Sequence, residues 1–355
     1  MIVNWSDNNR PTCYPHSVRR VRHLAVFVIL AVGIAVGVAG LSNSRVASPI
    51  MRSEGPPLST STERPPEVTE PVTLRVVTWN IADAYLFTGN RPERMRAIAA
   101  RLRALDPDLV GLQEAFIEED RALLWRELEG SRLRHEVRFP GATVGNGLWI
   151  LSAHPIEEAR FHRYRSGGPW YRIWEGDWWA GKGVGLARVR LPGGALVDFF
   201  DTHAQAGRGN PENETFRFGQ MGELASFVQD ARQHAGPALV VGDLNTRPGA
   251  PDYERAMREA DLFRTMNLDS DIDHVFAVRD ERWQIEVLDT VELVGETPGA
   301  RPEFFLSRAP SPVEWLHATL GAAGSTRLSD HPGYWVSLRV TPIPPTLPAP
   351  PALPR

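Results

Sequence analysis

The sequence predicts a single α/β domain over residues 72–340, and three observations support this fold class. Short apolar segments that alternate like β-strands are interleaved with segments whose apolar residues recur at helical spacing. The flanking residues 42–71 and 341–355 are rich in Pro and in small or polar residues, which is typical of a disordered linker and a Pro-rich tail. The region between them has the length of one large domain.

Strands and helices alternate through the first half of this domain. Residues 74–81 alternate and are β-branched, which predicts the first strand. A helix is expected next, with Asn90 as its cap and Pro92 in its first turn, and Asp106-Pro107 ends it. We further predict a helix at 118–129 and strands at 109–112, 134–139, 148–152 and 156–164.

The second half opens with an unusual segment. Residues 165–183 lack periodicity and combine five Gly with five aromatic residues, which predicts a long loop of the kind that often carries function. Strands at 184–191 and 196–201 flank a Pro-Gly-Gly turn as a hairpin, and a long helix is expected at 212–234. The remaining predicted elements are strands at 238–241, 272–276 and 334–340 and helices at 252–260 and 313–320.

An apolar segment near the N-terminus predicts export of the domain. Residues 24–41 are 18 consecutive apolar or Gly residues, long enough to span a bilayer, and three arginines precede them. Residues 1–23 should then be cytoplasmic, with the domain anchored to the membrane outside the cytoplasm. A cleaved signal peptide is the alternative, because Gly37-Val38-Ala39 is a small-x-small pattern, and the protein would then be secreted. The long segment before the apolar run favours the anchor.

Charge and cysteine content narrow the function classes only slightly. From residue 72 onward the chain holds 32 Lys and Arg against 38 Asp and Glu, which gives a mildly acidic domain of net charge −6. This is not the charge of a protein that binds nucleic acid mainly by neutralising its backbone. The single cysteine, Cys13, lies outside the domain, so the domain contains no disulfide.

Polar residues of catalytic types recur at the ends of the predicted strands. Asp243 and Asn245 are two residues apart, so in an extended segment both side chains point the same way at the carboxyl end of a buried strand. Open α/β sheets bind ligands there, although an Asx turn would also explain the pair. The full set of such residues is Asn80, Glu114, His203, Asp243, Asn245, Asp273, Asp330 and His331.

These residue types suit phosphodiester hydrolysis. A hard divalent cation, Mg²⁺ or alternatively Mn²⁺, is bound by carboxylate and amide oxygens together with phosphate oxygens of the substrate. One base must activate water, and hydrogen-bond donors must hold the non-bridging phosphate oxygens. An imidazole oriented by a buried carboxylate suits the role of base.

The order of these motifs resembles that of the endonuclease/exonuclease/phosphatase superfamily, which has the DNase I-like fold. The resemblance covers about residues 74–340. It implies a four-layer α/β sandwich, with two mainly antiparallel β-sheets flanked by helices, and a Mg²⁺-dependent phosphoester hydrolase. The motifs that carry it are Trp79-Asn80, Gln113-Glu114, Thr202-His203, Gly242-Asp243-Leu244-Asn245, Ile272-Asp273-His274 and Ser329-Asp330-His331.

The resemblance also implies a role for each residue of the set. Carried over by position, Glu114 is the main metal ligand, Asn80 lies near metal and phosphate, and His203 and Asn245 contact the phosphate. Asp243 and His331 are the catalytic aspartate and imidazole. Asp273 orients His331, and Asp330 lies beside His331 at the metal–phosphate centre. Which of Asp243 and His331 is the general base stays open.

A second resemblance bears on the substrate. Residues 175–186 are similar to the Gly-Asp-Trp…Gly-Lys…Gly-Leu segment of neutral sphingomyelinases. This implies hydrolysis of a phospholipid at a membrane surface, with sphingomyelin cleaved to ceramide and phosphocholine. Lys182, the only lysine of the chain, can pair with Asp177 or with a phosphate, so both are predicted to bind substrate. The tryptophans nearby are either core residues or contacts to a bilayer interface.

Three other functions remain as alternatives. An exported endonuclease or exonuclease of the same fold would use the same catalytic set on nucleic acid, and the acidic domain and aromatic loop argue against it. A membrane-tethered binding module with an inactive site is opposed by the complete set of catalytic residue types. An inositol-phosphate phosphatase is not favoured, because no dense basic cluster lies near the motifs. No protein partner is expected.

Overall fold

The computed structural model describes residues 50–53, 70–83, 90–141, 145–172, 177–232, 236–296 and 327–344. The predicted apolar segment 24–41, the predicted helix 313–320 and the tail beyond residue 344 lie outside these ranges. In the part of the chain that is described, no helix has both the length and the apolar character that crossing a bilayer requires.

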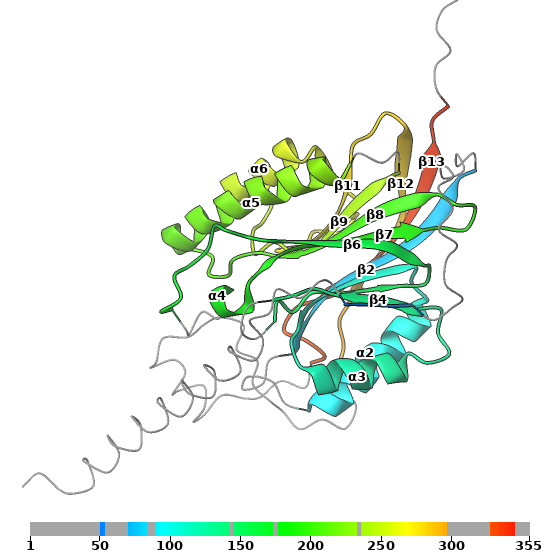
Figure 1. The fold of residues 1–355 in the computed structure, drawn as a ribbon, viewed down its shortest axis with the longest axis horizontal. Helices are drawn as coiled ribbons and strands as arrows, with labels where there is room; N and C mark the ends of the chain where they lie inside the picture. Colours follow the sequence, from blue (N-terminus) through cyan, green and yellow to red (C-terminus); the bar gives the residue numbers. More distant parts are fainter. Residues whose placement is uncertain are drawn as a thin grey trace, which may run out of the picture. The chain divides into compact units, whose positions relative to one another are not determined.

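Two β-sheets form the centre of the domain (Figure 1). The first sheet has seven strands in the order β1-β4-β5-β3-β2-β13-β12, and among these described strands the β2–β3 pair is parallel while the others are antiparallel. Its strands are β1 (Ile50–Ser53), β2 (Val72–Asp83), β3 (Leu109–Ala115), β4 (His135–Arg138), β5 (Trp149–Ser152), β12 (Trp283–Leu293) and β13 (Gly333–Pro342).

The second sheet has six strands in the order β10-β11-β9-β8-β7-β6. Here the β8–β9 pair is parallel and the other described pairs are antiparallel. Its strands are β6 (Ile156–Arg163), β7 (Gly183–Arg190), β8 (Leu196–His203), β9 (Ala238–Asp243), β10 (Leu262–Arg264) and β11 (Asp273–Val278).

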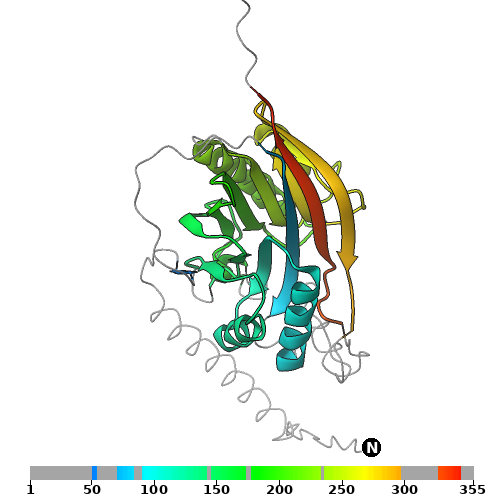
Figure 2. The same ribbon diagram turned by 90° about the vertical axis from the view of Figure 1, so that its right-hand side faces the viewer.

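Helices cover the outer face of each sheet (Figures 1 and 2). Helices α2 (Arg91–Leu105) and α3 (Glu118–Glu127) pack on the first sheet, where Met95 and Leu124 join the apolar cluster that contains Trp79. Helices α5 (Pro211–Ala231) and α6 (Pro251–Glu259) cover the second sheet, and Leu224 packs in the cluster that contains Val240. The predicted four-layer sandwich of two mainly antiparallel sheets is confirmed.

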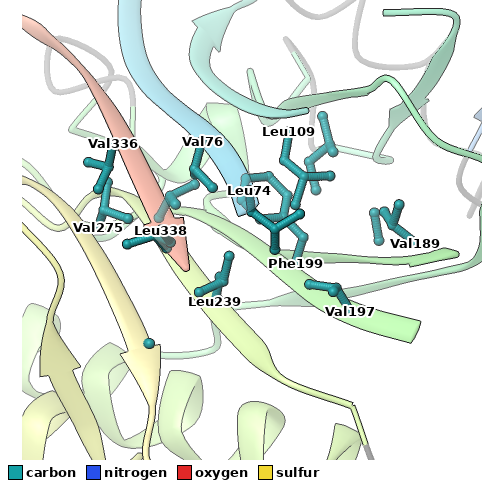
Figure 3. Close-up of a cluster of buried hydrophobic side chains, with 14 of the residues drawn as sticks. Leu74, Val76, Leu109, Val189, Val197, Phe199, Leu239, Val275, Val336 and Leu338 are labelled. Atoms are coloured by element: carbon teal, nitrogen blue, oxygen red, sulfur yellow. The ribbon is translucent and has the colours of Figure 1, made fainter. Parts of the chain in front are cut away.

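A third apolar cluster fills the space between the two sheets (Figure 3). Val76 and Leu338 of the first sheet meet Phe199, Leu239 and Val275 of the second, and all five are fully buried. This core holds the sheets face to face, because burying apolar surface is the main force that stabilises a folded domain.

Several local predictions differ from the structure. Asn90 lies at the start of α2 but its side chain makes no capping bond, because its backbone is left-handed (φ 43°) and not extended as capping requires. The segment 165–183 is not loop throughout, since Asp177–Ala180 form the short helix α4 and Gly183 begins β7. Within the predicted linker, β1 pairs with β4. Strands β10 and β12 are additional to the predicted set.

Candidate active site

The strand register brings the predicted residues to one edge of the two sheets. In the second sheet, His203, Asp243 and Asp273 are direct neighbours across β8, β9 and β11. In the first sheet, Asn80 on β2 pairs with the residue just before Glu114 on β3. Because β2–β3 and β8–β9 are parallel pairs, their carboxyl ends lie together, and the described part of the chain gathers all eight predicted residues there.

Asn80 connects the two halves of this site. Its Nδ2 donates to Glu114 Oε1 and to Asp243 Oδ2, both at 3.1 Å, while its Oδ1 accepts the Ala82 N–H at 3.0 Å. This network fixes the orientation of the amide, because only nitrogen can donate to two carboxylates. One amide therefore holds a carboxylate of each sheet in place.

Two residues of the site have unfavourable backbone conformations. Glu114 has φ 56° and Asn245 has φ 51°, both in the left-handed region. For a residue with a side chain this region costs about 1 kcal/mol, and such residues concentrate at functional sites.

His331 and Asp273 form a hydrogen-bonded dyad. His331 Nδ1 lies 2.8 Å from Asp273 Oδ2 and 3.8 Å from Asp243 Oδ2. Burial alone would lower the pKa of His331, but the charges of Asp273, Asp243 and Asp330 and the Asp273 hydrogen bond raise it well above its usual value. The imidazole is therefore protonated at neutral pH in this arrangement and is prepared to donate a proton from Nε2.

Asp243 uses its two carboxylate oxygens for different purposes. Oδ1 accepts the backbone N–H of Asn245 at 2.8 Å, which is the Asx turn that the sequence offered as an alternative. Oδ2 faces Asn80 and both imidazoles. Burial would raise the pKa of Asp243, but nearby positive charge and the Asn245 N–H lower it, so this carboxylate is ionised. The local turn therefore uses only Oδ1 and leaves Oδ2 facing the site.

His203 is held as a neutral imidazole. Burial and the charge of Lys182 lower the pKa of His203 to about 3. Lys182 Nζ lies 2.9 Å from His203 Nε2, and since an ammonium can only donate, Nε2 accepts and Nδ1 carries the proton. Asp243 Oδ2 is 3.4 Å from the same Nε2.

Lys182 and Asp177 make a buried ion pair behind this contact. The three N–H donors of Lys182 go to Asp177 Oδ1 at 2.5 Å, to His203 and to the Ala204 carbonyl at 2.8 Å. Asp177 Oδ2 accepts from Gln205 Nε2 at 2.7 Å. In this conformation every donor of Lys182 has a protein acceptor. These contacts support a role in orienting His203 better than they support the predicted role in binding substrate.

Ser329 was not among the predicted site residues. Its hydroxyl donates to the Asn80 carbonyl at 2.7 Å and accepts the His331 N–H at 3.1 Å. It thereby ties the segment that carries Asp330 and His331 to the end of β2. Its place beside Asp330-His331 was the only sequence signal for it.

The oxygen-rich part of the site fits a hard divalent cation. Glu114 and Asp243 supply carboxylate oxygens of the kind that Mg²⁺ prefers, whereas Asn80 turns its amide nitrogen toward them and would have to rotate to offer its oxygen. Burial and the charge of Asp330 raise the pKa of Glu114, so a cation here would relieve repulsion between carboxylates. Potential ligand atoms of Asp243, Asp273 and His331 also lie within 4.8 Å of one another. We favour the oxygen set, because Asp273 and His331 already bond to each other.

A buried histidine next to the site predicts how stability depends on pH. His274 contacts Ser270 Oγ through Nδ1 at 3.0 Å and the Thr246 carbonyl through Nε2 at 2.9 Å, and burial lowers its pKa to about 4. In the unfolded chain the pKa of this imidazole is near 6.5, so between pH 4 and 6.5 the imidazole is protonated when the chain is unfolded and neutral when it is folded. The contribution of His274 to stability is therefore present above pH 6.5 and falls by about 3 kcal/mol as the pH drops to 4.

Urea unfolding of wild type and His274→Gln between pH 4 and 7.5 checks this expectation. The variant should lose less stability across that window than wild type does. Equal pH slopes for the two proteins would contradict it.

The fold defines a class of protein, that of the DNase I-like fold. The chain belongs to the Endonuclease/Exonuclease/phosphatase family, whose model matches residues 77–331.

Two named proteins are similar in sequence to part of this chain. The chain is 33% identical over 199 residues to a putative neutral sphingomyelinase of Drosophila melanogaster, and 31% identical over 196 residues to an inositol phosphosphingolipids phospholipase C of Schizosaccharomyces pombe. The matches cover 56% and 55% of this chain and 45% of each relative, so the chain spans less than half the length of these relatives.

A solved structure shares the fold. It is that of a beta toxin mutant from Staphylococcus aureus with bound magnesium ions. It superposes with a TM-score of 0.51 at 16% identity, over 76% of this chain and 99% of that one.

Proposed function

We propose that the protein is a Mg²⁺-dependent phosphodiesterase that cleaves a sphingolipid in the manner of a phospholipase C, with sphingomyelin hydrolysed to ceramide and phosphocholine. The observation that carries the proposal is the His331–Asp273 dyad beside an ionised Asp243 and the partly buried carboxylate of Glu114. The similarity to a putative neutral sphingomyelinase and to an inositol phosphosphingolipids phospholipase C supports the substrate class.

The pKa directions suggest how the two proton transfers are divided. Asp243 is ionised and can take a proton from the attacking water, while protonated His331 can give its Nε2 proton to the leaving alkoxide. The bond from phosphorus to the lipid oxygen breaks as the bond to the water oxygen forms. Asn245 Nδ2 would donate to a non-bridging oxygen, whereas the predicted phosphate contact of His203 would require its proton to move from Nδ1 to Nε2. When bound at Glu114 and Asn80, Mg²⁺ would supply Lewis-acid stabilisation of the phosphate charge.

Exposed aromatic residues support the action on lipid at a membrane surface. Trp170, Tyr171 and Trp178 are 61%, 58% and 41% exposed, so they are not the core residues of the alternative interpretation. Tryptophan and tyrosine favour the bilayer interface. The predicted anchor or signal at 24–41 would be consistent with a reaction outside the cytoplasm.

Parallel assays of the full-length protein test the proposed function. Sphingomyelin vesicles and plasmid DNA are each incubated with the protein and Mg²⁺, with and without chelator. We expect phosphocholine release that the chelator abolishes, and no nicking of DNA. Nicking without lipid turnover would instead select the nuclease alternative, and turnover that survives the chelator would contradict the metal dependence.

A further inference from the structure

The active site is divided between two sheets, so its geometry depends on how closely the sheets are held. Asn80 and Glu114 belong to the first sheet, and His203 and Asp243 to the second. The Glu114 Oε1 to His203 Nε2 distance is 3.9 Å. A small change in sheet spacing would therefore alter the distances on which the chemistry depends.

One buried polar contact links the sheets directly beneath this site. Gln113 Nε2 donates to Asp201 Oδ1 at 2.6 Å, which joins β3 to β8, and both side chains are completely buried. Gln113 immediately precedes Glu114, and Asp201 lies two residues before His203 on the same face of β8. The contact thus lies next to a site residue in each sheet.

The backbone at this point leaves little room for adjustment. A Cβ atom added at Gly111 on β3 would lie 2.6 Å from Val241 Cγ2 and 3.0 Å from Asp201 Cγ. Real Cβ atoms do not approach other atoms so closely, so a glycine is required for the sheets to reach this separation. Close approach and hydrogen bond act together to set the spacing.

Stability alone does not account for this polar pair. Burial raises the pKa of Asp201 well above its usual value, so the side chain is a neutral acid. Asp201 Oδ2 and Gln113 Oε1 are buried and have no hydrogen-bond partner among the described residues. Unsatisfied buried polar atoms cost free energy, and an apolar pair of similar shape would avoid that cost. A contribution to positioning offers a reason for such a pair.

We propose that Gln113 and Asp201 are positioning residues, whose hydrogen bond fixes β3 against β8 and thereby sets Glu114 against His203 and Asp243. This inference rests on the proposed function. Misplacing reacting groups by 1 Å can cost about 100-fold in rate, so a bond that defines this spacing should affect kcat more than KM.

Variants that keep or remove the bond test the proposal. Asp201→Leu preserves the shape without the acceptor, whereas Asp201→Asn retains an acceptor oxygen and the neutral charge. Gln113→Leu removes the same bond from the other strand. Val197→Ala and Leu109→Ala are matched controls, because they are fully buried core positions elsewhere on β8 and β3.

Thermal unfolding, kcat and KM are measured on sphingomyelin vesicles, and Mn²⁺ affinity is measured by calorimetry. We expect both Leu variants to lower kcat by about 10-fold to 100-fold with little change in KM, and to weaken Mn²⁺ binding by about tenfold. Asp201→Asn should keep kcat within about threefold of the wild-type value. The control variants should do the same even where their melting temperature falls as much as that of the Leu variants.

Two results would overturn the proposal: Leu variants whose kcat and Mn²⁺ affinity match the controls, or an Asn variant as impaired as Asp201→Leu. If wild type cleaves no phosphodiester, the proposed function fails, and Mn²⁺ affinity alone then decides whether the pair positions Glu114. The two failures are therefore distinguishable.

Discussion

Replacing His331 with Ala is expected to lower kcat by about 10²-fold to 10⁴-fold, the range for loss of a positioned acid or base. The imidazole is bonded to Asp273 through Nδ1 and lies 3.8 Å from Asp243. In the proposed mechanism, removing the imidazole leaves the departing alkoxide without its proton donor. Circular dichroism and kcat on sphingomyelin vesicles measure the effect.

Asp273→Asn should show that the His331–Asp273 dyad, and not the imidazole alone, sets how kcat depends on pH. Because Asp273 helps to raise the pKa of His331, the variant should lose its protonated imidazole at lower pH than wild type. The fall in kcat on the alkaline side should therefore shift to lower pH. A profile unchanged in the variant would contradict the role of general acid.

His154→Gln provides a matched control for these variants. His154 Nε2 also pairs with a carboxylate, Asp108 Oδ1 at 3.3 Å, but at the opposite end of β3. Its kcat should stay near the wild-type value.

Glu114→Gln is expected to abolish most metal-dependent turnover. The substitution keeps the shape and the hydrogen bond from Asn80 but removes the negative charge that a divalent cation needs. If the cation supplies about 4 kcal/mol of transition-state stabilisation, its loss lowers kcat about 10³-fold. Because burial of this carboxylate is unfavourable, the melting temperature should not fall.

Calorimetric titration with Mg²⁺ and Mn²⁺ separates a metal ligand from a residue with some other role. Glu114→Gln should bind neither ion measurably, whereas Glu129→Gln, at an exposed position, should bind as wild type does. Wild-type affinity in Glu114→Gln would rule out Glu114 as the main metal ligand.

The sequence was informative wherever a polar residue directly followed an apolar strand. Asp243 and His203 could be predicted because each ends a buried apolar run, and the fold class followed from the order of such runs. Asp273 could be associated with His331 only through family resemblance, since 58 residues separate them.

Other features depend on which strands face each other, and a linear pattern does not contain that information. The Gln113–Asp201 bond joins two sheets across 88 residues. Strand β12 was missed although Trp283, Ile285 and Val287 alternate with polar residues, because this edge strand lacks the continuous apolar run that marks the central strands. Lys182 was recognised as unusual, but its contacts with His203 and Ala204 arise from the hairpin geometry of β7 and β8.

The left-handed backbone at Glu114 and Asn245 has a consequence for laboratory evolution of this protein. Glycine adopts that conformation without the steric penalty of a Cβ atom, so Glu114→Gly and Asn245→Gly should relieve local strain while deleting side chains of the site. Selection for heat resistance alone would therefore favour inactive sequences at these two positions. A screen for a more durable enzyme must select for turnover and melting temperature at the same time.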